Sequence, residues 1–271
     1  MKYAMCNELY ERWSFGHVCD FLAENGYGGV EIAPFTFADD VRNLERKRRD
    51  VLRQEAERAG IQITGLHWLL AKTDGFYLTS PDAAVRKNTA DYFAATIDLC
   101  ADLGGSYMVL GSPKQRNLLP GVTREQASEY ACDVLRRLIP QLEQNKIVLT
   151  LEPLAPTETD FLTTAAETAE LLQKIDAPQQ IALHLDCKAM ASESAPIPDL
   201  IRKYRAEMKT FHANDPNLQG PGFGRLDFVP IMSALREIQF NGWVSVEVFD
   251  YSPTPERLTI ESISYLKECG G

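Results

Sequence analysis

Short apolar runs alternate with longer amphipathic stretches along the whole chain. Eight of the runs have the length and β-branched content of strands: Lys2 to Cys6, Gly29 to Ala33, Gln62 to His67, Tyr107 to Leu110, Ile147 to Glu152, Ile181 to Asp186, Met208 to Ala213 and Trp243 to Phe249. Regular alternation of this kind is typical of repeated βα units. Eight such units predict a closed (β/α)8 barrel of the α/β class.

The stretches between the runs have helical spacing and helix start and stop signals. They are Ser14 to Glu24, Val41 to Ala59, Pro81 to Leu103, Thr123 to Gln144, Thr163 to Lys174, Ile197 to Ala206, Asp227 to Ile238 and Pro255 to Glu268. Gly26, Gly60 and Gly104 stand where a left-handed residue would end a helix before the next strand. No linker interrupts the pattern, so we expect one domain over residues 1–271.

The net charge limits the possible binding partners, and the cysteine content bears on the cellular location. The formal net charge is −10, which disfavours nucleic acid and acidic membranes and favours a small neutral ligand or a local cation. The six cysteines form no CxxC pair, and the N-terminus does not resemble a signal peptide. We therefore expect buried thiols, no membrane segment and a cytoplasmic location.

Four of the apolar runs lead directly into a potential metal ligand. VLTLEP, IALHLD, KTFHAND and WVSVEVF end in or near Glu152, Asp186, His212 and Glu247, about 34, 26 and 35 residues apart, which is roughly one βα unit each. A carboxylate at the end of an apolar strand is costly unless it is paired or bound to a cation. For any one of them an ordinary salt-bridged carboxylate is the alternative, but together they predict a metal site at the barrel mouth.

The ligand types limit which metal would bind. Three carboxylates and one imidazole form a mostly oxygen site with one nitrogen, which suits Mn²⁺, Mg²⁺ or Co²⁺ and tolerates Zn²⁺. We expect one divalent ion per chain, with Mn²⁺ first among these.

In the segments GGVEIAP, GLHWLL, LEPLAPTETDF, LHLD, FHAND and VSVEVF, the chain resembles a known family. It is similar to the xylose-isomerase-like TIM barrels of sugar isomerases and epimerases, and most of all to the ketose 3-epimerases of the tagatose and psicose type. The resemblance implies that Glu152, Asp186, His212 and Glu247 hold the metal. It also implies that Glu152 and Glu247 are catalytic, one removing a proton next to a ketose carbonyl and the other returning it to the opposite face of an enediolate.

Three further residues are candidates for contacts with the sugar. In the resembled epimerases a glutamate at the position of Glu158 contacts sugar hydroxyls, although a solvent-exposed loop acid is the alternative here. His67 is expected at the mouth beside Trp68, which could form an apolar wall, and Glu31 stands at the equivalent place on the second strand. Two other histidines are not expected in the site: His17 lies on a helix, and His184 is expected to point out of the barrel.

Two positions depart from the resembled pattern. Ala189 stands where those epimerases have a substrate-binding histidine, and Leu218 stands where they have an arginine. The replacements available nearby are Lys188, Asn214, Asp215, Arg225 and Asp227. We expect Lys188, Asp215 and Arg225 to contact substrate, with a solvated loop lysine as the alternative for Lys188. The departures affect the expected substrate and leave the metal ligands unchanged.

Two loops that follow strands are long enough to cover a site. They run from Leu70 to Ser80 and from Asp215 to Leu226, and they are either lids or ordinary surface loops.

Three other functions compete with a sugar isomerase or epimerase. A lyase of the inosose dehydratase kind would share the ligands and the first proton abstraction. A repair nuclease of the endonuclease IV type would need more histidines and a basic groove, and only four histidines are present. A sugar-binding barrel without catalysis is the third. The expected partner is a small sugar, and related barrels are often homodimers or homotetramers.

Overall fold

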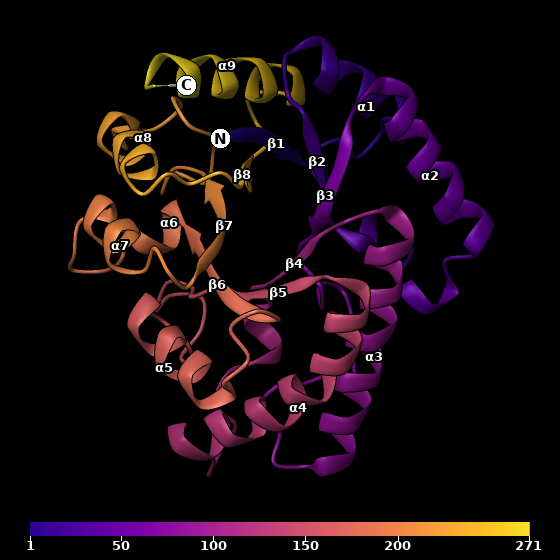
Figure 1. Cartoon of the computed structure of the whole chain (residues 1–271), viewed down its shortest axis with the longest axis vertical. Coiled ribbons are helices and arrows are strands. Elements are labelled where there is room, and N and C mark those ends of the chain that lie inside the picture. Colours follow the sequence, from indigo (N-terminus) through magenta and orange to yellow (C-terminus); the bar gives the residue numbers. More distant parts are fainter. Residues whose placement is uncertain (271) are drawn as a thin grey trace.

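Eight parallel strands close into a barrel in the computed structural model, which describes residues 1–270 (Figure 1). The strands are β1 (Lys2–Cys6), β2 (Gly29–Ile32), β3 (Gln62–Leu66), β4 (Tyr107–Leu110), β5 (Val148–Leu151), β6 (Ile181–Asp186), β7 (Met208–Ala213) and β8 (Trp243–Val246). Each strand pairs with the next along the chain, and β8 pairs with β1. The predicted (β/α)8 barrel is confirmed.

Helices surround the barrel, as Figure 1 shows. They are α1 (Phe15–Glu24), α2 (Arg46–Ala59), α3 (Ala83–Leu103), α4 (Arg124–Asn145), α5 (Ala165–Ile175), α6 (Cys187–Met190), α7 (Ile197–Lys203), α8 (Phe228–Glu237) and α9 (Pro255–Glu268). Short 3-10 turns lie at η1 (Pro34–Thr36), η2 (Val41–Asn43) and η3 (Pro113–Gln115). Gly26, Gly60 and Gly104 have φ of 83°, 72° and 81°, as predicted for residues that end a helix.

The prediction of one helix from Val41 to Ala59 is wrong. Only Val41–Asn43 and Arg46–Ala59 are helical, because Leu44 between them is extended at φ −77° and ψ 104°. Arg49 reaches back and donates hydrogen bonds to the Leu44 and Val41 carbonyls. These side-chain bonds satisfy backbone acceptors that a continuous helix would have paired with its own amides.

Two of the strands that carry candidate ligands end earlier along the chain than the sequence pattern predicted. β5 ends at Leu151 and β8 at Val246, whereas the sequence pattern predicted strands to Glu152 and Phe249. Glu152 and Glu247 each donate one more backbone bond to the preceding strand, to the Leu110 and Ala213 carbonyls. Both glutamates therefore stand at the C-terminal rim, while Asp186 and His212 lie inside β6 and β7.

A register shift between β6 and β7 sets the direction of their side chains. Leu183 pairs with Met208, but the next residue, His184, pairs with Thr210, so that Lys209 is an extra residue in β7. Beyond this bulge Asp186 pairs with His212. Paired residues of parallel strands project to the same side of the sheet. The bulge therefore places the side chains of Asp186 and His212 next to each other.

The burial of the cysteines agrees with the expectation from the sequence. All six cysteines lie within the described residues, and they are buried and unpaired. In residues 1–270 no helix combines the length and apolar character that a membrane span requires.

Candidate active site

The rim of the barrel brings the four predicted metal ligands together. Donor atoms of Glu152, Asp186 and His212 lie within 4.8 Å of one another, together with a ring nitrogen of His184. Glu247 joins them through its Oε2, which lies 3.1 Å from Nδ1 of His212. All of these side chains are buried, and Glu152 is the most exposed of them at 7%. Four consecutive strands therefore contribute to one compact group of donors.

His212 is held between two carboxylates. Its Nε2 lies 2.9 Å from Oε1 of Glu31, and its Nδ1 faces Glu247. Glu31 in turn accepts hydrogen bonds of 2.6 Å from the hydroxyls of Tyr107 and Ser245. Burial opposes ionisation of Glu31, but His212 outweighs it and holds the pKa of Glu31 well below its usual range. Glu31 thus orients the ring and leaves Nδ1 facing the rim, as partners of metal-binding histidines do.

Asp186 is fixed by groups from α6 and from the segment after β7. Its carboxylate accepts hydrogen bonds from the Ala189 amide at 2.7 Å and from the Asn214 side chain. Burial, reinforced by the charge of Glu247, raises the pKa of Asp186 to about 6. The positive charges of Lys188 and His212 lower the pKa of this carboxyl, but they do not outweigh burial and Glu247.

Among the four predicted ligands, Glu152 has the fewest hydrogen bonds to its side chain. Within residues 1–270 no hydrogen-bond donor reaches its carboxylate, and burial together with Glu247 and Asp186 raises its pKa well above the usual range. Gly111 makes room for the carboxylate, because a Cβ at that position would lie 2.3 Å from Oε2 of Glu152. A buried carboxylate without donors, beside two other carboxylates and an imidazole, fits a divalent cation.

Glu247 differs from Glu152 in its partners. The Trp68 indole donates a hydrogen bond of 2.7 Å to Oε1 of Glu247. Burial acts to raise the pKa of Glu247, but His212 and then Trp68 outweigh it and keep the pKa below its usual range. The two predicted catalytic carboxyls thus have opposite proton affinities in the metal-free protein.

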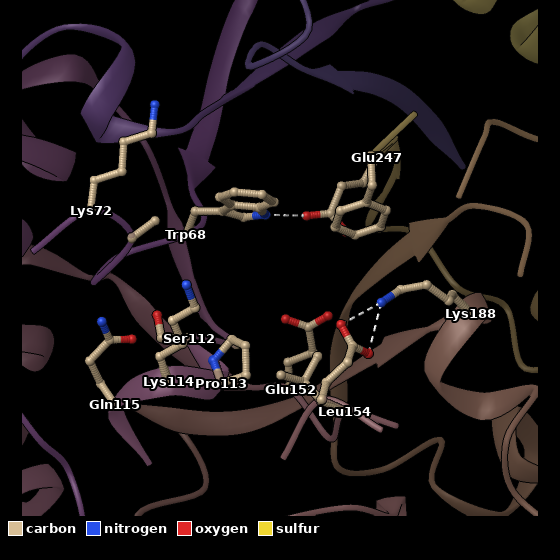
Figure 2. A pocket seen from close by; sticks show the side chains of 14 residues that line it. Trp68, Lys72, Ser112, Pro113, Lys114, Gln115, Glu152, Leu154, Lys188 and Glu247 are labelled. Atoms are coloured by element: carbon tan, nitrogen blue, oxygen red, sulfur yellow. Dashed lines mark hydrogen bonds and ion pairs between the residues drawn. The ribbon is translucent and has the colours of Figure 1, made fainter. Parts of the chain in front are cut away.

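A pocket of about 370 Å³ opens over these two glutamates. Figure 2 shows Glu247 and Glu152 on facing sides of it, with Trp68 beside Glu247. Its other walls come from the loops after β4, β5, β6 and β8, including Ser112, Leu154, Lys188 and Phe249. Lys72, from the loop after β3, also lines it. The pocket has the size and mixed polarity of a site for a small polar molecule.

Lys188 and Glu158 form one unit in this pocket. The ammonium of Lys188 donates to both carboxylate oxygens of Glu158 at 2.8 Å and lies 4.5 Å from the centre of the Phe249 ring. Both residues line the pocket, as predicted for substrate-binding residues, and the pairing between them was not predicted. Ala189, the predicted place of a missing histidine, is buried behind them.

Four predicted substrate contacts lie outside the lining of this pocket. Glu31 and His67 are buried below it, and His67 Nε2 is bonded to Glu8 at 2.9 Å. Asp215 and Arg225 line a separate depression formed by the loop after β7. Asp215 shapes that loop by accepting from the Asn217 and Leu226 amides. Direct contact of these residues with substrate stays a prediction.

The prediction that His184 points out of the barrel is wrong. Its ring lies 4.1 Å from the ring of His212, and its Nδ1 is 2.7 Å from the hydroxyl of Thr210 inside the barrel. Residues two apart on a strand share a face, so His184 follows Asp186 inward. Its Nε2 has no hydrogen-bond partner among the described residues. Burial and the charge of His212 lower the pKa of His184 well below the usual range, which leaves a neutral ring. His17 lies on α1, as predicted.

Sequence reasoning missed two residues next to the site. Glu8 stands two residues beyond β1 and binds His67, so that the strand-end rule used for the other acids could have found it. Arg116 is 2% exposed and donates to the backbone carbonyls of Glu152 and Leu162. No pattern in the sequence distinguishes it from a surface arginine.

Comparisons with known proteins agree with this architecture. The D-psicose 3-epimerase of Ruminiclostridium cellulolyticum is 26% identical over 262 residues, covering 92% of this chain and 84% of the relative. The fructoselysine 3-epimerase of Shigella flexneri is 22% identical, covering 92% and 90%. A crystal structure of a D-psicose 3-epimerase in the presence of D-fructose superposes with a TM-score of 0.87 at 21% identity over 100% of both chains.

These findings confirm the resemblance to ketose 3-epimerases and the prediction of an isomerase-class enzyme. The model of the xylose isomerase-like TIM barrel family matches residues 19–269. The chain belongs to the xylose isomerase-like TIM barrel family.

Proposed function

We propose that the protein is a divalent-metal-dependent sugar epimerase that moves a proton at a carbon next to a ketose carbonyl. The observation that carries the proposal is the pair Glu152 and Glu247, which face one pocket from β5 and β8 (Figure 2). Two carboxyls on facing sides of a bound sugar can exchange a proton on both faces of the same carbon.

The two glutamates have different partners in the metal-free protein. Glu247 is kept ionised by His212 and Trp68, whereas the pKa of Glu152 is raised by burial and by its acidic neighbours. In one direction Glu247 takes the proton from the carbon and Glu152 supplies one to the opposite face. The roles reverse in the other direction, and solvent exchange restores the starting protonation between turnovers.

Glu152, Asp186, His212 and Glu247 would hold the cation. A divalent ion bound there supplies positive charge that stabilises the anion formed when the proton leaves. The oxygen-rich donor set favours Mn²⁺, with Mg²⁺, Co²⁺ or Zn²⁺ as possible substitutes. In the metal-free protein a proton on His212 balances part of the negative charge of the surrounding carboxylates. Glu31 and Glu247 raise the pKa of His212 against the effect of burial.

The named relatives support an epimerase acting on a small sugar. Both curated relatives are called 3-epimerases, so the lyase alternative is not favoured. Lys188 and Glu158 would bind hydroxyls of the sugar, in place of the histidine that the resembled pattern has at Ala189. We further propose a cytoplasmic location, which the six unpaired cysteines support, and a homodimer or homotetramer.

Hydrogen exchange into heavy water tests the proposal directly. The protein loaded with Mn²⁺ is incubated with a panel of ketoses, and deuterium incorporation next to the carbonyl is followed by NMR and mass spectrometry. We expect exchange and a stereoisomeric product with wild type, and neither with Glu247→Gln. A product lighter by one water would identify a lyase instead, and metal analysis that finds no bound divalent ion after Mn²⁺ loading would overturn the metal site.

A further inference from the structure

A second pocket of about 300 Å³ lies beside the candidate active site. It is formed by the loop between β1 and α1, the first turns of α1 and the segment around η1. Its lining includes the acids Glu8 and Glu11, the aromatic residues Trp13, Phe35 and Phe37, and Lys72. None of the steps derived above uses this space.

The linings of the two pockets share a residue. Lys72 lines both of them. A strip of aromatic rings joins them, since Phe249 stacks on Trp68 at 6.0 Å and Trp68 lies 5.6 Å from Phe35. Carboxylate oxygens of Glu8 and Glu247 also belong to one group, with a nitrogen of His67, whose atoms lie within 4.8 Å of one another. One molecule bound at Glu247 can therefore extend over Trp68 and Lys72 into the second pocket.

The lining of the second pocket selects a neutral polyhydroxy group. Trp13, Phe35 and Phe37 are half-buried. The Trp13 ring already packs against His17 at 4.4 Å and the Phe35 ring against the Lys72 ammonium at 4.1 Å, so that the remaining ring surface is what can meet the C–H face of a sugar ring. Glu8 is 3% exposed, and its Oε1 has no hydrogen-bond partner among the described residues, so that a hydroxyl could donate to it. Glu8 pairs with His67 at 2.9 Å, and the ammonium of Lys72 lies 4.1 Å from the centre of the Phe35 ring.

We infer that the second pocket binds a second sugar unit, so that the preferred substrate is a ketose joined to another sugar ring through its non-reacting end. This inference rests on the proposed epimerase function. The ketose would occupy the pocket over Glu152 and Glu247, and the attached ring would stack between Trp13 and Phe37.

Comparison of single and joined sugars tests the inference. Deuterium exchange is measured with fructose and tagatose, and with lactulose and isomaltulose, two disaccharides that keep a free ketose end. We expect kcat/KM to be at least about tenfold higher for the better disaccharide than for the better monosaccharide. Exchange with monosaccharides but no gain with either disaccharide would overturn this inference and leave the epimerase proposal standing. No exchange with any of the four would overturn both.

Variants assign the preference to this pocket. Trp13→Ala should lower the ratio of disaccharide to monosaccharide kcat/KM about tenfold, and Glu11→Gln provides a second, exposed substitution in the same lining. Tyr130→Ala, a half-buried aromatic residue on α4, is the matched control and should leave the ratio unchanged. An unchanged ratio in both pocket variants would show that the disaccharide binds elsewhere and would overturn the inference.

Discussion

The indole nitrogen of Trp68 lies 2.7 Å from Oε1 of Glu247 and donates a hydrogen bond to it. Trp68 adopts a left-handed backbone conformation with φ of 53°, which costs a non-glycine residue about 1 kcal/mol or more. The backbone directly after β3 thus bends to aim the indole across the barrel at β8. The bond fixes one oxygen of the proposed base and leaves Oε2 beside His212.

Replacement of Trp68 by Phe should slow the proton transfer. The substitution keeps an aromatic wall but removes a donor to a buried carboxylate, and we expect kcat to fall about 10- to 100-fold. Steady-state exchange assays measure this effect. Trp243→Phe, at the opposite end of the barrel, is the control and should leave kcat unchanged. Equal kcat values for Trp68→Phe and wild type would contradict a role for the indole.

The stability of the metal-free protein should fall as pH rises from about 4 to about 6. The pKa of Asp186 is raised to about 6 in the folded protein from an unfolded value near 3.8, so the folded state binds more protons in this range. Thermal unfolding with chelator present should show this slope. Asp186→Asn should flatten it, and Mn²⁺ should raise Tm of the wild type more at pH 7 than at pH 5. A pH-independent effect of Mn²⁺ on Tm would contradict the predicted competition between metal and protons.

Glu158 and Lys188 should act together on substrate affinity. Each holds the other at 2.8 Å, and neither is among the proposed proton-transfer groups. We expect Glu158→Gln and Lys188→Met each to raise KM about tenfold, with a smaller effect on kcat. The double variant should be much less than additive, because either single change disrupts the same pair. Strict additivity in KM would indicate two independent contacts.

Arg116 should stabilise the rim through its buried bonds. Loss of two charged donors to the Glu152 and Leu162 carbonyls is expected to lower the free energy of unfolding of Arg116→Met by about 2 to 4 kcal/mol. Urea unfolding measures the change. Arg257→Met, which removes an exposed arginine paired with Glu261, should leave the urea midpoint nearly unchanged. Similar midpoints for the two variants would contradict an anchoring role for Arg116.

The barrel could be predicted from the sequence because each strand is a short apolar run with clear boundaries. The same pattern located Glu152, Asp186, His212 and Glu247, since parallel strands direct their C-terminal ends to one rim. The helix expected from Val41 was wrong because a side chain, Arg49, satisfies the carbonyls there. Such a bond depends on tertiary position and leaves no trace in local periodicity.

The residues that line the pocket were harder to predict than the four predicted metal ligands. Lys188 lines the pocket as expected, but its partner Glu158 comes from another loop, and loop conformations bring such residues together. Asp215 is nearly as close in sequence to a predicted ligand, His212, as Lys188 is to Asp186, yet Asp215 lines a separate depression together with Arg225. The distance of a residue from a strand end therefore predicts which side chains gather at the rim better than it predicts which side chains line the pocket.

The extra residue Lys209 in β7 makes this centre sensitive to the length of the strand as well as to its composition. Removing that one residue would keep every ligand in the sequence, and Met208 and Thr210 would then pair consecutively with Leu183 and His184 in a ladder without a bulge. The strand would then lose the local bend and the added twist that the bulge supplies just before Thr210 and His212. Insertions and deletions in this strand are thus expected to be excluded during divergence, even where substitutions are tolerated.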